Sequence, residues 1–311
     1  MVSAVMFIIA GLVLLAGAGE MFVRSAITIA ARLDISPMVI GLTIVAFGTS
    51  MPELMVSIQA VLAGQADISV GNVVGSNIAN VLLVLGAAAA ISPFICDLET
   101  IKRDGALMIG ASLILVAISF LGDVPQFVGF GMLILLAVIL FVQVRSGEAP
   151  GVEDVEHLLP GGLFLNVPLM ITALAGVIWG ADLLIEGAID IATFIGVSEA
   201  VIGLTVVAIG TSLPELVVSI IAALRGHAAV AVGNVIGSNI FNILLILGAA
   251  ASIGPLSISA EIAGRDIWVM FASSVLMLLC LRFGATLSRR EGLAALLLYL
   301  VYNVYLFNVG S

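Results

Sequence analysis

Residues 41–86 read GLTIVAFGTSMPELMVSIQAVLAGQADISVGNVVGSNIANVLLVLG, and residues 203–248 read GLTVVAIGTSLPELVVSIIAALRGHAAVAVGNVIGSNIFNILLILG. The two stretches align without a gap at an offset of 162 residues and share 31 identities in 46 positions. Similarity of this extent at a fixed offset indicates an internal duplication. The fold therefore consists of two copies of one unit, and each copy carries a proline and a glutamate inside a long apolar stretch.

The composition shows what surrounds these two copies. Hydrophobic residues make up 62% of the 311 residues, charged residues only 10%, and the mean hydropathy is +1.32. Soluble domains carry roughly 45–50% apolar and about 25% charged residues, so the solvent of this chain must be largely a lipid bilayer. The net charge of −10 excludes a nucleic-acid-binding protein, which needs a basic face. The two cysteines, Cys96 and Cys280, form no metal-binding motif.

Ten apolar stretches are candidates for membrane helices, each of which needs about 20 residues to cross a bilayer. Their approximate limits are 2–23, 37–63, 70–90, 104–121, 126–144, 161–185, 199–224, 230–251, 266–283 and 291–308. No basic residue precedes the first stretch, so we expect a retained helix rather than a cleaved signal peptide. The prediction is an all-α polytopic protein of the cell membrane, the inner or plasma membrane, with ten transmembrane helices.

The basic residues predict the orientation of these spans, because Lys and Arg concentrate in cytoplasmic loops. Nine of the ten Lys and Arg residues follow an odd-numbered span, and only Arg265 follows an even-numbered one. The loops after odd-numbered spans are therefore predicted to be cytoplasmic. Both chain termini are then predicted to lie outside, an N-out/C-out arrangement.

The span count makes the two copies inverted. Each copy contains five spans, an odd number, so the second must cross the membrane in the opposite sense to the first. Inverted five-helix repeats are typical of secondary transporters, whose substrate site lies near the midplane where the repeats meet. We expect a single transport domain over residues 1–311, with repeat one at about 1–144, a cytoplasmic linker at about 145–160 and repeat two at about 161–311. Two such halves complete one site, so a monomer is sufficient for function.

The motif GTSxPE places chemistry in the middle of a predicted span in both copies. It occurs at residues 48–53, ending in Glu53, and at residues 210–215, ending in Glu215. A charged side chain at the centre of a bilayer costs at least ~2.5–3.5 kcal/mol, so it normally has a partner or a function. Proline removes one helical hydrogen bond and frees a carbonyl oxygen. Each copy therefore offers carboxylate, hydroxyl and carbonyl oxygens together.

The motif GSNIxN in the following span adds neutral oxygens. Ser76 and Asn80 are four residues apart and share one helix face, as do Ser238 and Asn242. Asn77 and Asn239 stand one step off this face, where helix–helix hydrogen bonding is as good an interpretation as contact with an ion.

Oxygen ligands select hard cations. Two bidentate carboxylates supply four oxygens, and two threonine carbonyls with waters reach the six to eight that Ca²⁺ takes. Two glutamates also match the charge of one Ca²⁺. Transition metals favour His or Cys, and the duplicated block contains only His227, near a loop. Na⁺ can use the same oxygens, and competition between the two cations at one site would give exchange.

These motifs resemble the α-repeats of the cation/Ca²⁺ exchanger superfamily, and the whole chain is similar to its prokaryotic Na⁺/Ca²⁺ exchanger branch. GTSxPE and GNVxGSNIxN occur twice at the expected separation, and the resemblance covers essentially the full length. It implies an antiporter and not an enzyme, with Ca²⁺ and Na⁺ as transported substrates and no cofactor. It also implies that spans 1 and 6 slide across the remaining helices during transport.

The resemblance assigns roles to residues of both motifs. It implies that Glu53 and Glu215 are the central Ca²⁺ ligands, together with Thr49 and Thr211. The Na⁺ ligands that it implies are the side chains of Ser50, Ser212, Ser76 and Ser238 and the carbonyls of Ala46 and Ala208. Some relatives carry an acid where this chain has Asn80 or Asn242, and potassium-dependent ones tend to have Asp there. We therefore expect no K⁺ requirement.

Charge counting and the resemblance disagree on stoichiometry. The site carries a formal charge of −2, which two Na⁺ would neutralise, whereas the resemblance implies three Na⁺ for each Ca²⁺ and electrogenic transport. The number of duplicated oxygen ligands favours three. An inward Na⁺ gradient would then drive Ca²⁺ out of the cell.

Other functions and simpler interpretations remain open at this point. A Ca²⁺/H⁺ antiporter of the same architecture would protonate the glutamates instead of binding Na⁺, and a passive cation channel is less favoured by the close-packing glycine faces. A glutamate beside a proline could also be no more than a hydrogen-bonded acid at a kink. On the sixth span, Asp182, Glu186 and Asp190 are interpreted as solvated rather than as an external vestibule for cations.

Overall fold

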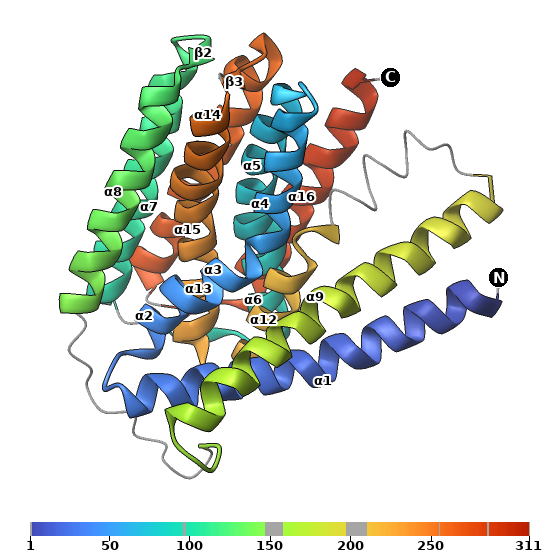
Figure 1. Cartoon of the computed structure of the whole chain (residues 1–311), viewed down its shortest axis with the longest axis vertical. Helices are drawn as coiled ribbons and strands as arrows, with labels where there is room; N and C mark the ends of the chain where they lie inside the picture. The colour runs from blue at the N-terminus through green and yellow to red at the C-terminus, as the bar shows by residue number, and fades with distance from the viewer. Residues whose placement is uncertain are drawn as a thin grey trace.

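The computed structural model describes residues 2–95, 98–146, 158–196, 210–254, 256–284 and 286–310, and these form an almost entirely helical bundle (Figure 1). Seven described helices are long and apolar enough to cross a membrane, and a bent pair, Pro37–Thr49 with Met51–Leu62, makes an eighth. Helix α7 (Leu98–Ser119) begins with charged residues, and α12 (Leu213–Leu224) is short because the chain leaves helical geometry at Ser212, directly before it. The membrane character and the helical class are confirmed.

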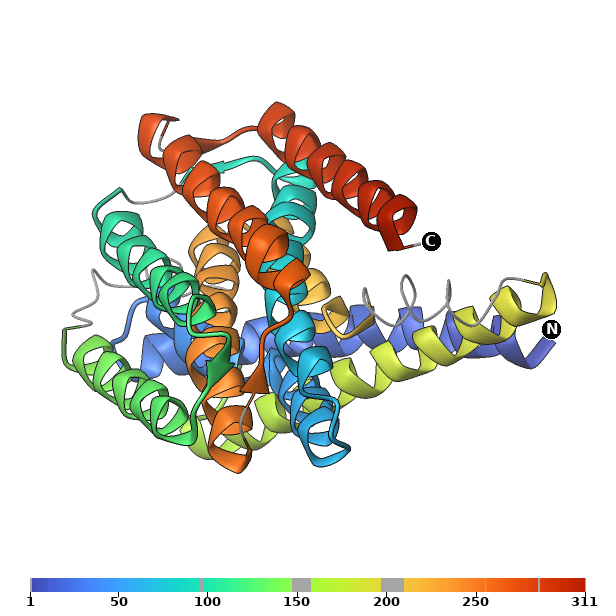
Figure 2. The same cartoon turned by 90° about the horizontal axis from the view of Figure 1, so that it is seen from above.

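Two long helices lie side by side and extend to one side of the bundle. Helix α1 spans Val2–Arg32 and helix α9 spans Leu163–Phe194, and they run alongside each other (Figures 1 and 2). Glycines permit this approach, since a Cβ on Gly187 would lie 2.6 Å from the Ala4 carbonyl oxygen and one on Gly11 would lie 2.7 Å from that of Gly180. No side chain larger than hydrogen fits at these two points.

Both long helices end later than the sequence limits predicted. Arg24 and Arg32, expected in a loop after a span ending at 23, lie within α1, and α9 continues nine residues past 185. The predicted limit of 23 for α1 is wrong, because the helix continues past Arg24 to Arg32. Ser25 to Ala30 are all buried against the protein, so this part of the helix has a protein environment and not a lipid one. A single charge on its exposed side does not end it.

The equivalent helices of the two copies are interrupted in the same way. In the first copy, α2 (Pro37–Ile40), the π-helical segment η1 (Gly41–Val45) and α3 (Ala46–Thr49) form one arm, which meets α4 (Met51–Leu62) at a 45° bend. In the second copy, α12 begins directly after the same turn. Proline at the second helical position and a missing backbone donor account for the break.

The centre of the bundle is formed by the next helix of each copy. Helix α5 (Ala66–Ala79) continues through the π-helix η2 (Asn80–Leu85) into α6 (Gly86–Ile91). Helix α13 (Ala228–Phe241) continues through η5 (Asn242–Leu247) into α14 (Gly248–Ile253), and this span is the most buried of the molecule's described spans. The π-helices start at Asn80 and Asn242, and single π-turns inside α-helices often mark functional sites.

The remaining helices and four short strands enclose this centre. Helices α7, α8 (Gln126–Ser146), α15 (Ile267–Gly284, preceded by η6, Ile262–Asp266) and α16 (Arg289–Gly310) pack around it. The strand β1 (Phe94–Ile95) pairs with β4 (Thr286–Leu287), and β2 (Asp123–Val124) pairs with β3 (Leu256–Ser257). Each strand pair joins one strand from the first half of the chain to one from the second.

Candidate cation site

The two GTSxPE motifs adopt the same local backbone. Ser50 has φ −81° and ψ 6°, and Ser212 has φ −87° and ψ 6°, so each serine leaves helical geometry just before a helix with proline at its second position. The glutamate follows in the first turn of that helix, where unpaired N–H groups and the helix dipole favour negative charge. The motif therefore positions its carboxylate by the same rule in both copies.

Glu53 and Glu215 are both buried, each with only 1% of its surface exposed, and they lie near enough to interact electrostatically. Within the described residues, neither oxygen of the Glu53 carboxylate has a hydrogen-bond partner, and Oε2 of Glu215 has none either. An acid that only stabilised a kink would have its oxygens satisfied by donors, because an unpaired buried charge is costly. Three of the four carboxylate oxygens are thus available to a cation.

The hydroxyl groups cross between the copies. Ser50 of the first copy donates a hydrogen bond to Oε1 of Glu215 in the second, over 3.3 Å. In the reverse direction, the hydroxyl groups of Thr211 and Ser212 lie close to the Glu53 carboxylate. Each glutamate therefore faces the serine and threonine of the other copy, which the sequence did not predict, because it places all four residue types within one turn.

The arm of the first copy is also tied to the second copy at Thr49. Thr49 Oγ1 is within hydrogen-bond distance of two acceptors, Oδ1 of Asn234 at 3.1 Å and the Ala46 carbonyl oxygen at 3.4 Å. Ala46, Thr49 and Ser50 are all completely buried, and Thr211 is half-buried. Ala208, the predicted counterpart of Ala46, lies outside the described residues, so its role stays a prediction.

The GSNIxN motifs lie against the two glutamate-bearing helices. Helix α4 contacts η5, which begins at Asn242, and α12 contacts η2, which begins at Asn80. Asn80 donates to Oδ1 of Asn239 over 3.1 Å, which fits the helix–helix interpretation of Asn239. Buried oxygens without a hydrogen-bond partner in the described structure belong to Asn77, Asn80, Ser238 and Asn242. Ser76 is also buried, with 5% of its surface exposed.

Sequence reasoning missed two pairs of residues beside the glutamates. Asn72 donates to the Ser57 hydroxyl over 2.9 Å and to the Glu53 carbonyl over 3.1 Å. In the second copy Asn234 donates to the Ser219 hydroxyl over 3.0 Å and to the Glu215 carbonyl over 3.5 Å. All of these residues are identical between the copies, and Asn72 and Asn234 lie one turn before Ser76 and Ser238. That repetition is the signal that could have found them.

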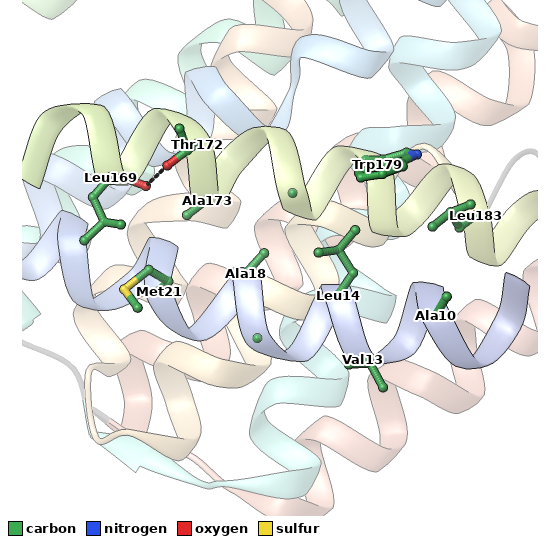
Figure 3. A pocket seen from close by; sticks show the side chains of 12 residues that line it. Ala10, Val13, Leu14, Ala18, Met21, Leu169, Thr172, Ala173, Trp179 and Leu183 are labelled. Carbon is green, nitrogen blue, oxygen red and sulfur yellow. Dashed lines mark hydrogen bonds between the residues drawn. The ribbon is translucent and has the colours of Figure 1, made fainter. Parts of the chain in front are cut away.

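An apolar groove between two long helices is not part of this site. It has a volume of about 630 Å³ and runs between α1 and α9, lined by apolar side chains such as Leu14, Ala18 and Leu183 (Figure 3). The hydroxyl of Thr172, also in its lining, is bonded to the Pro168 and Leu169 carbonyls of its own helix. The groove thus offers nothing to a cation. The described residues also contain no group of three His, Cys, Asp or Glu side chains that could hold a metal ion.

Comparison with known proteins finds similarity over most of the chain. The family model described as "Sodium/calcium exchanger protein" matches residues 3–145 and 165–308. CaxA of Alkalimonas amylolytica is 42% identical over 320 residues, covering 99% of this chain and 100% of its own. The sodium/calcium exchanger MaX1 of Methanosarcina acetivorans is 35% identical, and 98% of each chain is covered.

A solved structure of the sodium-calcium exchanger NCX_Mj, soaked without Na⁺ and Ca²⁺, superimposes with a TM-score of 0.86. It is 33% identical, and the superposition covers 98% of this chain and 99% of the other. The long helices α1 and α9, the paired interrupted helices and the central buried pair therefore make up the fold of that exchanger. The protein is a multi-pass membrane protein, and it belongs to the sodium/calcium exchanger family.

Proposed function

We propose that this protein is an antiporter that exchanges Na⁺ for Ca²⁺ across the cell membrane by alternating access. Its family is one of cation/Ca²⁺ antiporters. The observation that carries the proposal is the pair of buried glutamates, whose three unpartnered carboxylate oxygens face hydroxyl groups of the opposite copy. Both halves of the chain thus contribute a negatively charged carboxylate and hydroxyl oxygens to one place.

In the proposed site, Ca²⁺ is held by the carboxylates of Glu53 and Glu215 and by the carbonyl oxygens of Thr49 and Thr211. Ca²⁺ takes six to eight oxygens at about 2.3–2.6 Å, which carboxylates and carbonyls can supply with water. Na⁺ is held by subsets of the same oxygens with additional neutral ligands. These additional ligands are Ser50, Ser212, Ser76, Ser238, Asn80 and Asn242, with the carbonyls of Ala46 and Ala208.

The proposed architecture is ten transmembrane helices in two inverted five-helix repeats, with both termini outside. It makes one transport domain of residues 1–311, with the linker near 145–160, and a monomer is sufficient. Repeated features support the duplication, including a broken helix and a π-helix at equivalent places and an Arg–Asp pair at residues 103–104 and again at 265–266. The inversion rests on the odd number of spans in each copy and on the distribution of basic residues. Alternating access is the usual mechanism of such folds.

The proposed stoichiometry is three Na⁺ for each Ca²⁺, so that transport moves net charge and an inward Na⁺ gradient extrudes Ca²⁺. Support comes from the number of oxygens around the glutamates. Most of these are hydroxyl and amide oxygens that could hold Na⁺ but would add nothing to the binding of a proton. The same groups favour Na⁺ coupling over the alternative, in which protons replace Na⁺ on the glutamates.

The test is uptake of radioactive Ca²⁺ into proteoliposomes that are loaded with Na⁺ and diluted into Na⁺-free buffer. A parallel set carries a pH gradient only, and Glu53→Gln and Glu215→Gln are measured in both. We expect uptake that needs the Na⁺ gradient and is lost in both variants. In the wild-type protein it should raise the internal Ca²⁺ concentration above the external one. Uptake driven by the pH gradient alone would make the protein a Ca²⁺/H⁺ antiporter, and flux that never accumulates Ca²⁺ would make it a channel.

A further inference from the structure

The Asn234 side chain links three parts of the candidate site. It is completely buried on α13, its amide nitrogen donates to the Ser219 hydroxyl and the Glu215 carbonyl, and its oxygen accepts from Thr49 of the first copy. A carbonyl oxygen can only accept, so the nitrogen of this amide must point to Glu215. The oxygen is then left for Thr49, and both ends of the side chain have a fixed assignment.

The Thr49 hydroxyl, which bonds Asn234, has a second possible acceptor in the Ala46 carbonyl, a proposed cation ligand. A threonine hydroxyl in a helix commonly donates to a carbonyl three or four residues earlier, which for Thr49 is that of Ala46 or Val45. The distance from Thr49 to the Ala46 carbonyl oxygen is 3.4 Å, longer than the 3.1 Å to Asn234. The hydroxyl has one proton for these two acceptors, and the shorter distance favours Asn234 over the Ala46 carbonyl.

We infer that Asn234 is a positioning residue for cation binding, which holds the arm of the first copy against the glutamate helix of the second. It acts through Thr49: the hydrogen bond fixes the end of α3 and draws the hydroxyl from the Ala46 carbonyl oxygen. That oxygen accepts from the Ser50 N–H, and its second lone pair is then left for a cation. The inference rests on the proposed function, and it adds to that function a residue that holds ligands without being one.

Asn72 provides a control within the same chain. It makes the equivalent bonds to Ser57 and Glu53, but no hydrogen bond joins Thr211 to Asn72 in the described structure. Asn72 therefore shares the contacts that tie two helices of one copy and lacks the contact that joins the two copies. The variant Asn72→Leu therefore tests only the hydrogen bonds that join two helices within one copy.

The experiment measures the Ca²⁺ concentration for half-maximal uptake in Thr49→Val, Asn234→Leu and the double variant, with Asn72→Leu alone and combined with Thr49→Val. A lost hydrogen bond lowers affinity by about three- to tenfold, so Thr49→Val and Asn234→Leu should each raise the half-maximal concentration by about that factor. The double variant should bind Ca²⁺ no more weakly than the single variant of lower affinity, because both substitutions remove the same hydrogen bond. When Thr49→Val and Asn72→Leu are combined, their fold-changes in the half-maximal Ca²⁺ concentration should instead multiply, because the two residues share no hydrogen bond.

Multiplying effects of Thr49→Val and Asn234→Leu would overturn the inference, while wild-type uptake on a Na⁺ gradient still upheld the proposed function. Wild-type protein without such uptake would reject the proposed function itself. Should Asn234→Leu fail to give a monodisperse protein, Thr49→Ser, which keeps the hydroxyl, is compared with Thr49→Val. Near wild-type affinity in the serine variant and weaker affinity in the valine variant supports the inference, and equal affinities contradict it.

Discussion

The two copies have the same GTSxPE turn but not the same contacts. Ser50 and Thr49 of the first copy are bonded to Glu215 and Asn234 of the second, whereas the described structure gives the hydroxyl of Ser212 no hydrogen-bond partner. The backbone angles at the two serines are nearly equal. The difference therefore comes from how the copies are placed against each other and not from the turns themselves.

The long helices differ in the same sense. Gly19 of α1 packs against Val217 and Ile221 of α12, and beside it Glu20 forms an ion pair with Arg225 at 2.8 Å. The equivalent residues of α9 are Ala181 and Asp182, and the equivalent face of α4 is exposed, with Met55 at 55%. In the proposed mechanism the two copies exchange roles during transport, and such a pair would be asymmetric in this way in any one state.

The largest effect is expected at the two serines. Ser50→Ala removes a hydrogen bond to a charged group, which contributes about 1.5–3 kcal/mol, and should weaken Na⁺-driven uptake by ten- to hundredfold. Ser212→Ala removes the equivalent hydroxyl, which has no hydrogen-bond partner in the described structure. If the copies exchange roles in each transport cycle, both variants pass through both states and should be equally impaired. The measurement is the Na⁺ dependence of Ca²⁺ uptake. Impairment of Ser50→Ala alone would show that the asymmetry is permanent.

A smaller effect is expected at the two Arg–Asp pairs. Asp104 is completely buried and accepts a 2.6 Å bond from Gln143 of α8, while Asp266, 9% exposed, accepts a 2.9 Å bond from Tyr302 of α16. Gln143→Leu should lower the free energy of unfolding by about 1.5–3 kcal/mol, because it takes a donor from a buried charge. Tyr302→Phe should cost about 1 kcal/mol. Thermal unfolding in detergent measures both, and the reverse order would contradict the burial argument.

The smallest effect is expected at the ion pair of α1, where Arg225 and Glu20 are 59% and 26% exposed. Exposed pairs contribute about 0.2–1 kcal/mol, which changes the ratio of two states by up to about fivefold. Arg225→Gln should shift the equilibrium between the two conformations of the transport cycle away from the one described here. Ala63→Arg would place a cation at the equivalent position of the other copy, opposite Asp182, and should favour the opposite state.

Labelling of a cysteine introduced at Met55, which is exposed here, reports that shift. Both variants should reduce labelling, and Arg225→Lys should leave it unchanged. Equal labelling of Arg225→Gln and the parent protein would show that this ion pair does not bias the two states.

The sequence predicted the helical membrane class, the broken helices and the approach of the two glutamates, because proline, glycine and a buried acid impose local rules that the duplication repeats. It did not predict that Ser50 bonds Glu215, since contacts between copies depend on how they dock. The end of α1 was missed for a related reason: burial by neighbouring helices, which no local pattern records, lets the helix continue past Arg24. The sequence did not single out Asn234, because its bonds to Thr49, Ser219 and the Glu215 carbonyl depend on how the helices pack.

The crossing of hydroxyl groups between the copies also has a consequence for synthesis of the chain. Glu53 is synthesised about 160 residues before Thr211 and Ser212, so its carboxylate enters the membrane before the hydroxyl groups that lie near it in the folded protein exist. At a cost of at least ~2.5–3.5 kcal/mol in the bilayer, the first half is then a poorly stable intermediate. The strands β1 and β2 likewise wait for β4 and β3. The contacts that join the two copies can therefore form only after the second copy has been synthesised.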